Sequence, residues 1–212
     1  MRSGCGGCLV GLLAGFLLAA AALGVAWVAT LVLATPEVET PVTTTEDSAR
    51  AQGKVLALYR RPSGDRASTG SIVLTEREVN ALVNRALVDE APLSPTLVHL
   101  RGDDRAEIAG RVRVEDLLGE EPLSTVRGWL PPRVRQRHVW LRTSVRIEVQ
   151  AGRRVQVRLA PMTASIGRLP IPVFALRWLL EPAALRYLRW VLPERARGLR
   201  IEPGQVVITT AG

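Results

Sequence analysis

The most regular feature of the hydrophobic pattern is an unbroken apolar run from Leu9 to Ala34. Its 26 residues include no charged residue, Asn or Gln, and Thr30 is its only polar side chain. As a helix it would be about 39 Å long, enough to cross a hydrocarbon core of about 30 Å. A soluble helix of this length would carry a polar stripe along one face. The run therefore predicts a transmembrane helix at residues 9–34.

The charges beside this run predict its orientation. Residues 1–8 carry Arg2 and the amino terminus, whereas the segment after the run is acidic until Arg50. Positive charge before a first span holds that end in the cytoplasm. The expected arrangement is a single-pass signal anchor in the cell membrane, with residues 1–8 cytoplasmic and the rest of the chain extracytoplasmic.

A cleaved signal peptide is the alternative, since small residues occur at Val32-Leu33-Ala34. A signal peptide has an apolar region of about 7–15 residues, and this run is longer, which favours an uncleaved anchor. Cys5 and Cys8 are the only cysteines in the chain. Their spacing alone supplies too few ligands for a zinc site, and the exported part is expected to contain no disulfide.

Beyond the apolar run, composition divides the chain into two further parts. Residues 35–50 are rich in Thr, Pro and acidic side chains and show no apolar periodicity, which predicts an extracytoplasmic linker. Residues 51–212 are long enough for one extracytoplasmic domain with its own core.

Within that domain, the clearest helix signal starts at Thr75. Glu78 lies three residues later, as in a capping box, and apolar residues then recur at helical spacing through Leu87. A second short helix is expected within residues 122–129. Residues 55–59 fit either a short strand or the end of a helix.

Alternating patterns predict antiparallel strands at residues 96–101, 107–114, 138–150 and 155–159, joined by turns at Gly102-Asp103-Asp104 and Ala151-Gly152. In the long strand 138–150 one face is apolar and the other carries Arg. Two short closing strands are expected at residues 199–201 and 206–209. The predicted fold class is α+β, an antiparallel sheet packed with two or three helices.

Between these strands, residues 173–192 are predicted to be helical, apolar on most sides and interrupted at Pro182. Such a helix needs more cover than one sheet face gives. Ordinary core packing is one explanation, and contact with lipid is the other.

Positive charge is concentrated in the last part of the chain. Residues 51–132 carry 11 basic and 12 acidic residues, whereas residues 133–212 carry 15 Arg and 4 Glu. An exported basic surface would face anionic lipid headgroups or wall polymers. The predicted topology argues against nucleic acid as the partner. Arg residues that merely cover solvated strand faces are the alternative explanation.

Recognisable catalytic chemistry is missing from the sequence. It contains no G-x-S-x-G, H-E-x-x-H or glycine-rich phosphate loop, and its two histidines, His99 and His138, lie in separate predicted strands. The expectation is therefore a protein that is not an enzyme and that has no metal site and no cofactor.

The order of the segments carries a family resemblance. The helix LTEREVNALVNRAL, the hairpins, the corner GRLPIP and the closing LRIEPGQVVIT together resemble the YpmS-like and AsmA-like membrane-anchored bacterial envelope proteins. Domains of this class are similar to the tubular lipid-binding fold. The resemblance implies a curved antiparallel sheet of long hairpins around an apolar groove, and it transfers no catalytic residue.

Two functions follow as hypotheses. The first is binding of lipid or another amphipathic envelope molecule, in lipid transport or envelope maintenance. Its expected acyl-contact residues are Phe174, Trp178, Leu179, Tyr187 and Trp190, and its expected headgroup residues are Arg142, Arg146 and Arg177. The alternative is a non-enzymatic scaffold whose basic face contacts an envelope protein or an anionic wall polymer.

Overall fold

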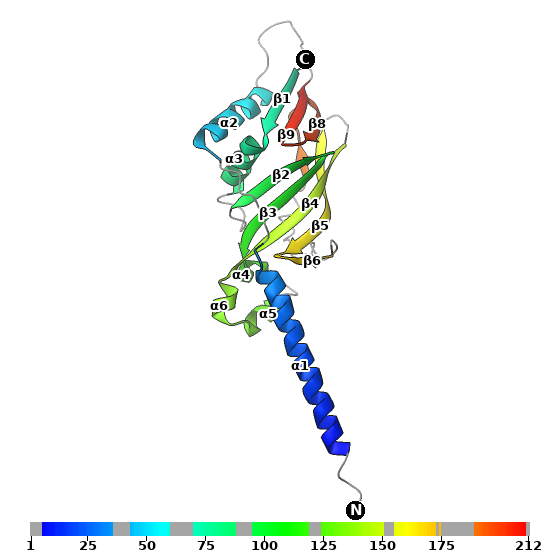
Figure 1. The fold of residues 1–212 in the computed structure, drawn as a ribbon. Coiled ribbons are helices and arrows are strands. Elements are labelled where there is room, and N and C mark those ends of the chain that lie inside the picture. The colour runs from blue at the N-terminus through cyan, green and yellow to red at the C-terminus, as the bar shows by residue number, and fades with distance from the viewer. Residues whose placement is uncertain are drawn as a thin grey trace, which may run out of the picture.

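A computed structural model describes residues 6–35, 43–59, 70–87, 95–118, 124–150, 155–172, 174 and 189–210. An apolar helix extends away from a body that contains antiparallel sheets and several helices (Figure 1). The coarse prediction of an α+β chain with an N-terminal apolar helix is confirmed. The strands form two open sheets, and the curvature that the resemblance implied stays a prediction.

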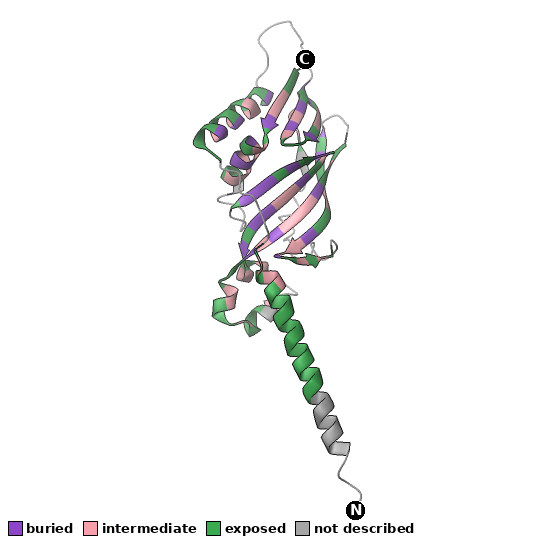
Figure 2. Ribbon diagram, in the orientation of Figure 1, coloured by how far each residue is buried: buried purple, intermediate pink, exposed green. Residues whose placement is uncertain are grey.

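Helix α1 (Gly6–Leu33) coincides with the predicted apolar run. Its segment Gly15–Leu33 has a mean hydropathy of 2.4, and by length and composition it could cross a membrane. Figure 2 shows this helix exposed along most of its described length, in contrast to the body of the protein. Among residues 15–33, whose burial is described, the partly buried positions lie at the C-terminal end, where Val32 contacts the apolar cluster of Val112, Val139 and Leu141.

Helix α2 (Thr45–Tyr59) corrects the predicted linker, which was expected to continue to residue 50. The helix begins earlier because Thr44 and Asp47 exchange hydrogen bonds across its first turn. Residues 55–59, for which the sequence allowed a strand or a helix end, are helical.

Helix α3 (Glu76–Leu87) confirms the predicted capping box. The Thr75 backbone N–H donates to Glu78 Oε2 at 2.8 Å, and the Glu78 N–H donates to Thr75 Oγ1 at 3.4 Å. This reciprocal pair satisfies two backbone donors that have no partner within the helix.

The larger sheet has six strands. Five follow one another in the order β2-β3-β4-β5-β6, and β7 pairs with β5. Their bounds are β2 (Thr96–Gly102), β3 (Arg105–Arg113), β4 (His138–Gln150), β5 (Gln156–Ile166), β6 (Leu169–Ile171) and β7 (Arg189–Val191). The predicted pairing of residues 138–150 with the strand that follows is confirmed. The Pro-rich corner forms edge strand β6, where a missing backbone N–H is tolerated.

Strand β7 corrects the end of the predicted helix 173–192. Arg189, Trp190 and Val191 pair with Arg158, Val157 and Gln156 on β5. This stretch of β5 lies outside the reach of β6, so β7 provides hydrogen-bond partners that β6 does not. The other predicted helical residues, except Phe174 and Leu192, lie outside the described residues.

The smaller sheet has the order β1-β9-β8 and is built from β1 (Gly70–Thr75), β8 (Ala196–Glu202) and β9 (Gln205–Thr210). The closing pair β8–β9 was predicted. Strand β1 pairs with β9 over its whole length although about 130 residues separate them, and no local pattern signals such a distant partner.

The main core lies between the two sheets and the helices α2 and α3. Its buried side chains include Leu58, Leu74, Leu100, Val145 and Ile208. All these elements cover the same face of the larger sheet, the face that contains Val98, Ala106 and Val145. The opposite face therefore holds the alternate residues of each strand.

Three short helices connect β3 to β4: α4 (Val114–Leu117), α5 (Ser124–Trp129) and α6 (Pro132–Arg135). Helix α5 falls within the range 122–129 predicted for a short helix. Figure 1 shows all three at the end of the larger sheet from which α1 extends.

Candidate functional site

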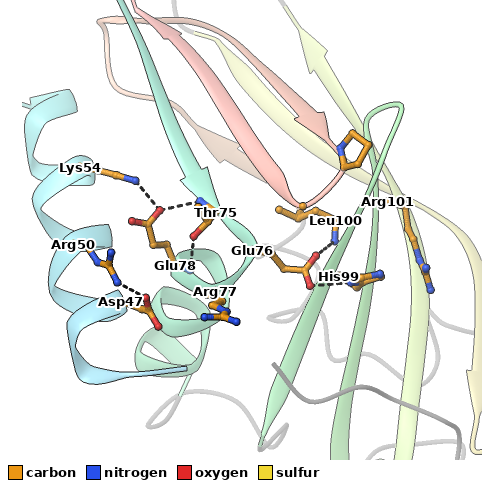
Figure 3. Close-up of a pocket in the computed structure, with 12 residues that line it drawn as sticks. Asp47, Arg50, Lys54, Thr75, Glu76, Arg77, Glu78, His99, Leu100 and Arg101 are labelled. Carbon is orange, nitrogen blue, oxygen red and sulfur yellow. Dashed lines mark hydrogen bonds and ion pairs between the residues drawn. The ribbon is translucent and has the colours of Figure 1, made fainter. Parts of the chain in front are cut away.

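A charged cleft of about 850 Å³ lies between α2, α3, β2 and the β8–β9 turn (Figure 3). Its lining includes three carboxylates and several basic side chains: Asp47, Glu76, Glu78, Arg50, Lys54, Arg77, His99 and Arg101. No sequence motif predicts that these residues meet, because they come from separate elements.

Glu78 joins α3 to α2 at the floor of this cleft. Its side chain is 4% exposed, and its Oε2 accepts a hydrogen bond from Lys54 Nζ at 2.8 Å. Lys54 also donates to the Val73 carbonyl at 2.8 Å. Burial opposes ionisation of Glu78, but the hydrogen bonds from Lys54 and the Thr75 N–H outweigh it, so the pKa of Glu78 lies below its usual value.

Glu76 joins α3 to β2, and each of its two carboxylate oxygens has a partner on β2. Oε2 accepts the Leu100 N–H at 2.7 Å, and Oε1 lies 2.8 Å from His99 Nδ1. The Glu76 N–H donates to the Gly204 carbonyl at 2.8 Å. His99, one of the two histidines considered in the sequence, thus contacts a carboxylate that is already bound to the backbone.

Asp47 closes the N-terminal turn of α2. Its carboxylate accepts the Thr44 N–H at 3.0 Å and pairs with Arg50 at 2.9 Å. The Thr44 hydrogen bonds, together with Arg50 and Arg77, hold the pKa of Asp47 below its usual value.

All three carboxylates of the cleft therefore bond to a backbone N–H, and each also contacts a basic or imidazole side chain. An acid–base catalyst needs a group that can approach a substrate proton. This network instead braces α2, α3 and β2 against one another.

Two asparagines extend this brace along the edge of β2. Asn80 donates to the Val98 carbonyl and accepts the Val98 N–H, both at 2.7 Å. Asn84 does the same for Thr96, at 2.7 and 2.9 Å. This role was not predicted, although Glu76, Asn80 and Asn84 recur every four residues on one helix face. These side chains bond the backbone N–H and C=O groups along the open edge of β2, which could otherwise pair with a strand of another chain.

The second candidate is the face of the larger sheet opposite the core, here called the basic sheet face. It carries seven arginines and two glutamates: Arg101, Arg105, Arg111, Arg113, Arg142, Arg146 and Arg158, with Glu107 and Glu148. Each arginine except the half-buried Arg142 is exposed.

Contacts within the basic sheet face neutralise only part of its charge. Glu107 pairs with Arg142 and with Arg101, the latter at 3.0 Å. The Arg111 guanidinium lies 5.5 Å from the centre of the Trp140 ring, a cation–π arrangement. The register places Arg105 directly opposite Arg146. Neither of these two arginines has an ion-pair partner among the described residues.

The structure places the predicted site residues in different regions. Arg142 and Arg146 lie together on the basic sheet face. Phe174 is 61% exposed, and Trp190 lies in β7 rather than in a helix. Arg177, Trp178, Leu179 and Tyr187 lie outside the described residues. Within the described part of the chain, no group of three or more His, Cys, Asp or Glu side chains could hold a metal ion.

Comparison of the chain with protein-family models, curated proteins and solved structures finds no match. The resemblance to the YpmS-like and AsmA-like proteins thus stays a prediction, and the functional argument depends on the geometry of this chain.

Proposed function

We propose that this protein is a membrane-anchored, extracytoplasmic interaction module that binds an anionic envelope molecule through its basic sheet face. The observation that carries the proposal is the pair Arg105 and Arg146, directly opposite on adjacent strands and both exposed. Like charges opposite each other on a sheet are destabilising. A phosphate or carboxylate bound between them would remove that repulsion.

Helix α1 supports the anchoring part of the proposal. It is apolar, exposed and long enough to span a bilayer. With residues 1–8 cytoplasmic, the basic sheet face would meet the polyanions outside the cytoplasm rather than nucleic acid.

The hydrogen-bond network of the charged cleft favours a structural role for its three carboxylates over a catalytic one. Its carboxylates hold backbone groups and cations of the protein itself. We therefore propose a non-enzymatic role in envelope maintenance.

Binding to a phosphodiester polymer tests the proposal. The full chain in nanodiscs is titrated with a soluble poly(glycerol phosphate), at several salt concentrations. Arg142→Glu with Arg146→Glu should weaken binding at least tenfold, because each reversal replaces attraction with repulsion. Arg197→Glu with Arg200→Glu is the matched control, since it makes the same change in net charge on exposed residues of β8. Equal affinity of the two variants would contradict the proposal.

The topology is tested separately with the two native cysteines. Cys5 and Cys8 precede α1, and the chain has no other cysteine. In intact cells a membrane-impermeant maleimide should leave them unlabelled and should label a Tyr59→Cys variant, because Tyr59 is 68% exposed. A mature protein lacking both cysteines would indicate cleavage, and the reverse labelling pattern would place the domain in the cytoplasm.

Lipid binding is a second candidate, favoured by the 61% exposure of Phe174, which lies three residues after the end of β6. Native mass spectrometry of the full chain released from detergent tests it. A stoichiometric lipid that is lost in Phe174→Ser would support an acyl-binding groove, and a chain free of lipid would exclude it.

A further inference from the structure

We propose that the segment 124–137, which contains α5 and α6, rests on the headgroup layer of the bilayer that α1 crosses. Trp129 would lie in the interface, and Arg127, Arg133 and Arg137 would contact lipid phosphates. This surface is distinct from the basic sheet face. The inference relies on the proposed anchoring by α1.

The first step is the firm attachment of α1 to the body of the protein. The Arg168 N–H donates to the Leu31 carbonyl at 2.8 Å. Gly167 has a φ of 58°, and a Cβ atom there would lie 2.3 Å from the Val32 carbonyl oxygen. This close approach admits only glycine. The helix end therefore has a defined position on the β5–β6 turn, and that position locates the membrane surface.

The second step is the position of the segment relative to that helix end. Val32 of α1 packs in the same apolar cluster as Val114 and Leu117 of α4. The Val114 N–H donates to the Arg137 carbonyl at 2.9 Å, which ties the end of the segment to the start of α4. Figure 1 shows α5 and α6 on the side of the larger sheet toward which α1 extends. The segment thus lies where α1 leaves the body.

The third step is the chemistry of the segment. It contains four arginines, at positions 127, 133, 135 and 137, and no acidic residue. Arg127, Arg133 and Arg137 are exposed and form no ion pair with the described residues. Among the described residues that precede the segment, the nearby acids are Glu115, which pairs with Arg113 at 3.6 Å, and Asp116.

Trp129 adds an apolar contact to this charge. Trp129 is 84% exposed. This is the largest exposed fraction of any large hydrophobic residue that the structure describes, those of α1 included. Tryptophan rings are enriched at membrane interfaces, where the ring is partly buried and its N–H stays hydrated. Basic residues beside such a ring contact anionic headgroups. The combination points to a lipid surface.

Site-specific fluorescence in membranes tests the inference. The full chain, with Cys5→Ser and Cys8→Ser, receives one labelled cysteine at a time: Trp129→Cys, Tyr59→Cys as an exposed control on α2, or Ala22→Cys within α1. Each protein is reconstituted in phosphatidylcholine vesicles that carry nitroxide quenchers at the headgroup or deep in the acyl chain. Vesicles with an equal share of phosphatidylglycerol provide the anionic surface.

The expected result is quenching by the headgroup nitroxide at position 129 that exceeds the quenching at position 59 roughly twofold or more. Arg127→Glu with Arg133→Glu should reduce this quenching in anionic vesicles, whereas Arg197→Glu with Arg200→Glu should not. Equal quenching at positions 129 and 59 would overturn the inference. The label at position 22 tests the anchor: its failure to respond to the deep quencher would overturn the anchoring, whatever position 129 does.

Discussion

Glu107 and Arg142 form an ion pair from β3 to β4 in the middle of the basic sheet face. The same carboxylate also holds Arg101 at 3.0 Å. Glu107 thus neutralises the face at the point where an anionic ligand would meet it. Glu107 therefore competes with the proposed anionic ligand for the same arginines.

Replacing Glu107 with Gln should strengthen binding to poly(glycerol phosphate). The substitution keeps the shape and a hydrogen-bond acceptor but frees the charge of two arginines. A surface ion pair is worth about 0.2–1 kcal/mol, which corresponds to a gain in affinity of roughly 1.4- to fivefold. Isothermal titration measures it, with Glu202→Gln on the β8–β9 turn as the control of equal charge. A gain of the same size in the control would indicate a net-charge effect and not a site on the sheet.

Glu78 should make the protein lose stability in acid. Its pKa is lowered in the folded state, so its contribution is present above the ordinary glutamate pKa of about 4.3 and is lost as the pH falls toward the folded value. Thermal unfolding in detergent between pH 3 and 7 is the measurement. The Glu78→Gln variant should be less stable at neutral pH and should show a flatter profile below about pH 4.3. Parallel profiles for the two proteins would contradict the assignment.

Asn80→Leu should be among the most destabilising single changes in α3. Asn80 is fully buried, and its removal leaves the N–H and C=O groups of Val98 without partners. Unsatisfied buried groups cost about 1–3 kcal/mol each, so a loss of roughly 2–6 kcal/mol is expected in denaturant unfolding. The hydrogen bonds of Asn84 are only partly buried, so Asn84→Leu should lower the free energy of unfolding by less. A larger loss at Asn84 would contradict the proposed ladder.

Gly167→Ala tests how α1 is fixed to the body. Gly204→Ala is the matched control because both glycines have a positive φ, but a Cβ at Gly204 meets nothing within 4 Å. The control should cost only the backbone strain, about 1 kcal/mol. Gly167→Ala should cost more and should speed hydrogen exchange of the Arg168 amide, which bonds to Leu31. Equal exchange of that amide in both variants would show that the helix end is not held there.

Local signals in the sequence predicted several elements well. The Thr75–Glu78 capping box identified α3, and alternation along residues 138–150 identified β4 and its pairing with β5. Both features are encoded by neighbouring residues, whose spacing specifies the hydrogen bonds and the buried face.

Other features depend on distant partners and were missed. The pairing of β1 with β9 and of β7 with β5 is decided by which sheet edges remain open after the other strands have paired. The early start of α2 depends on a reciprocal contact between Thr44 and Asp47 that composition obscured. The charged cleft gathers side chains from α2, α3 and β2, so no single motif marks it. Of the predicted site, Arg142 and Arg146 could be assigned to one face, because alternation along a strand fixes the side to which each residue points.

Arginine footprinting shows directly whether the basic sheet face binds a polyanion. The full chain in nanodiscs is treated with phenylglyoxal, with and without poly(glycerol phosphate), and modified arginines are located by mass spectrometry. We expect bound polymer to protect Arg105, Arg142 and Arg146 and to leave Arg197 and Arg200 as reactive as before. Protection of Arg197 and Arg200 alone, or equal protection of all five, would contradict a binding site on the basic sheet face.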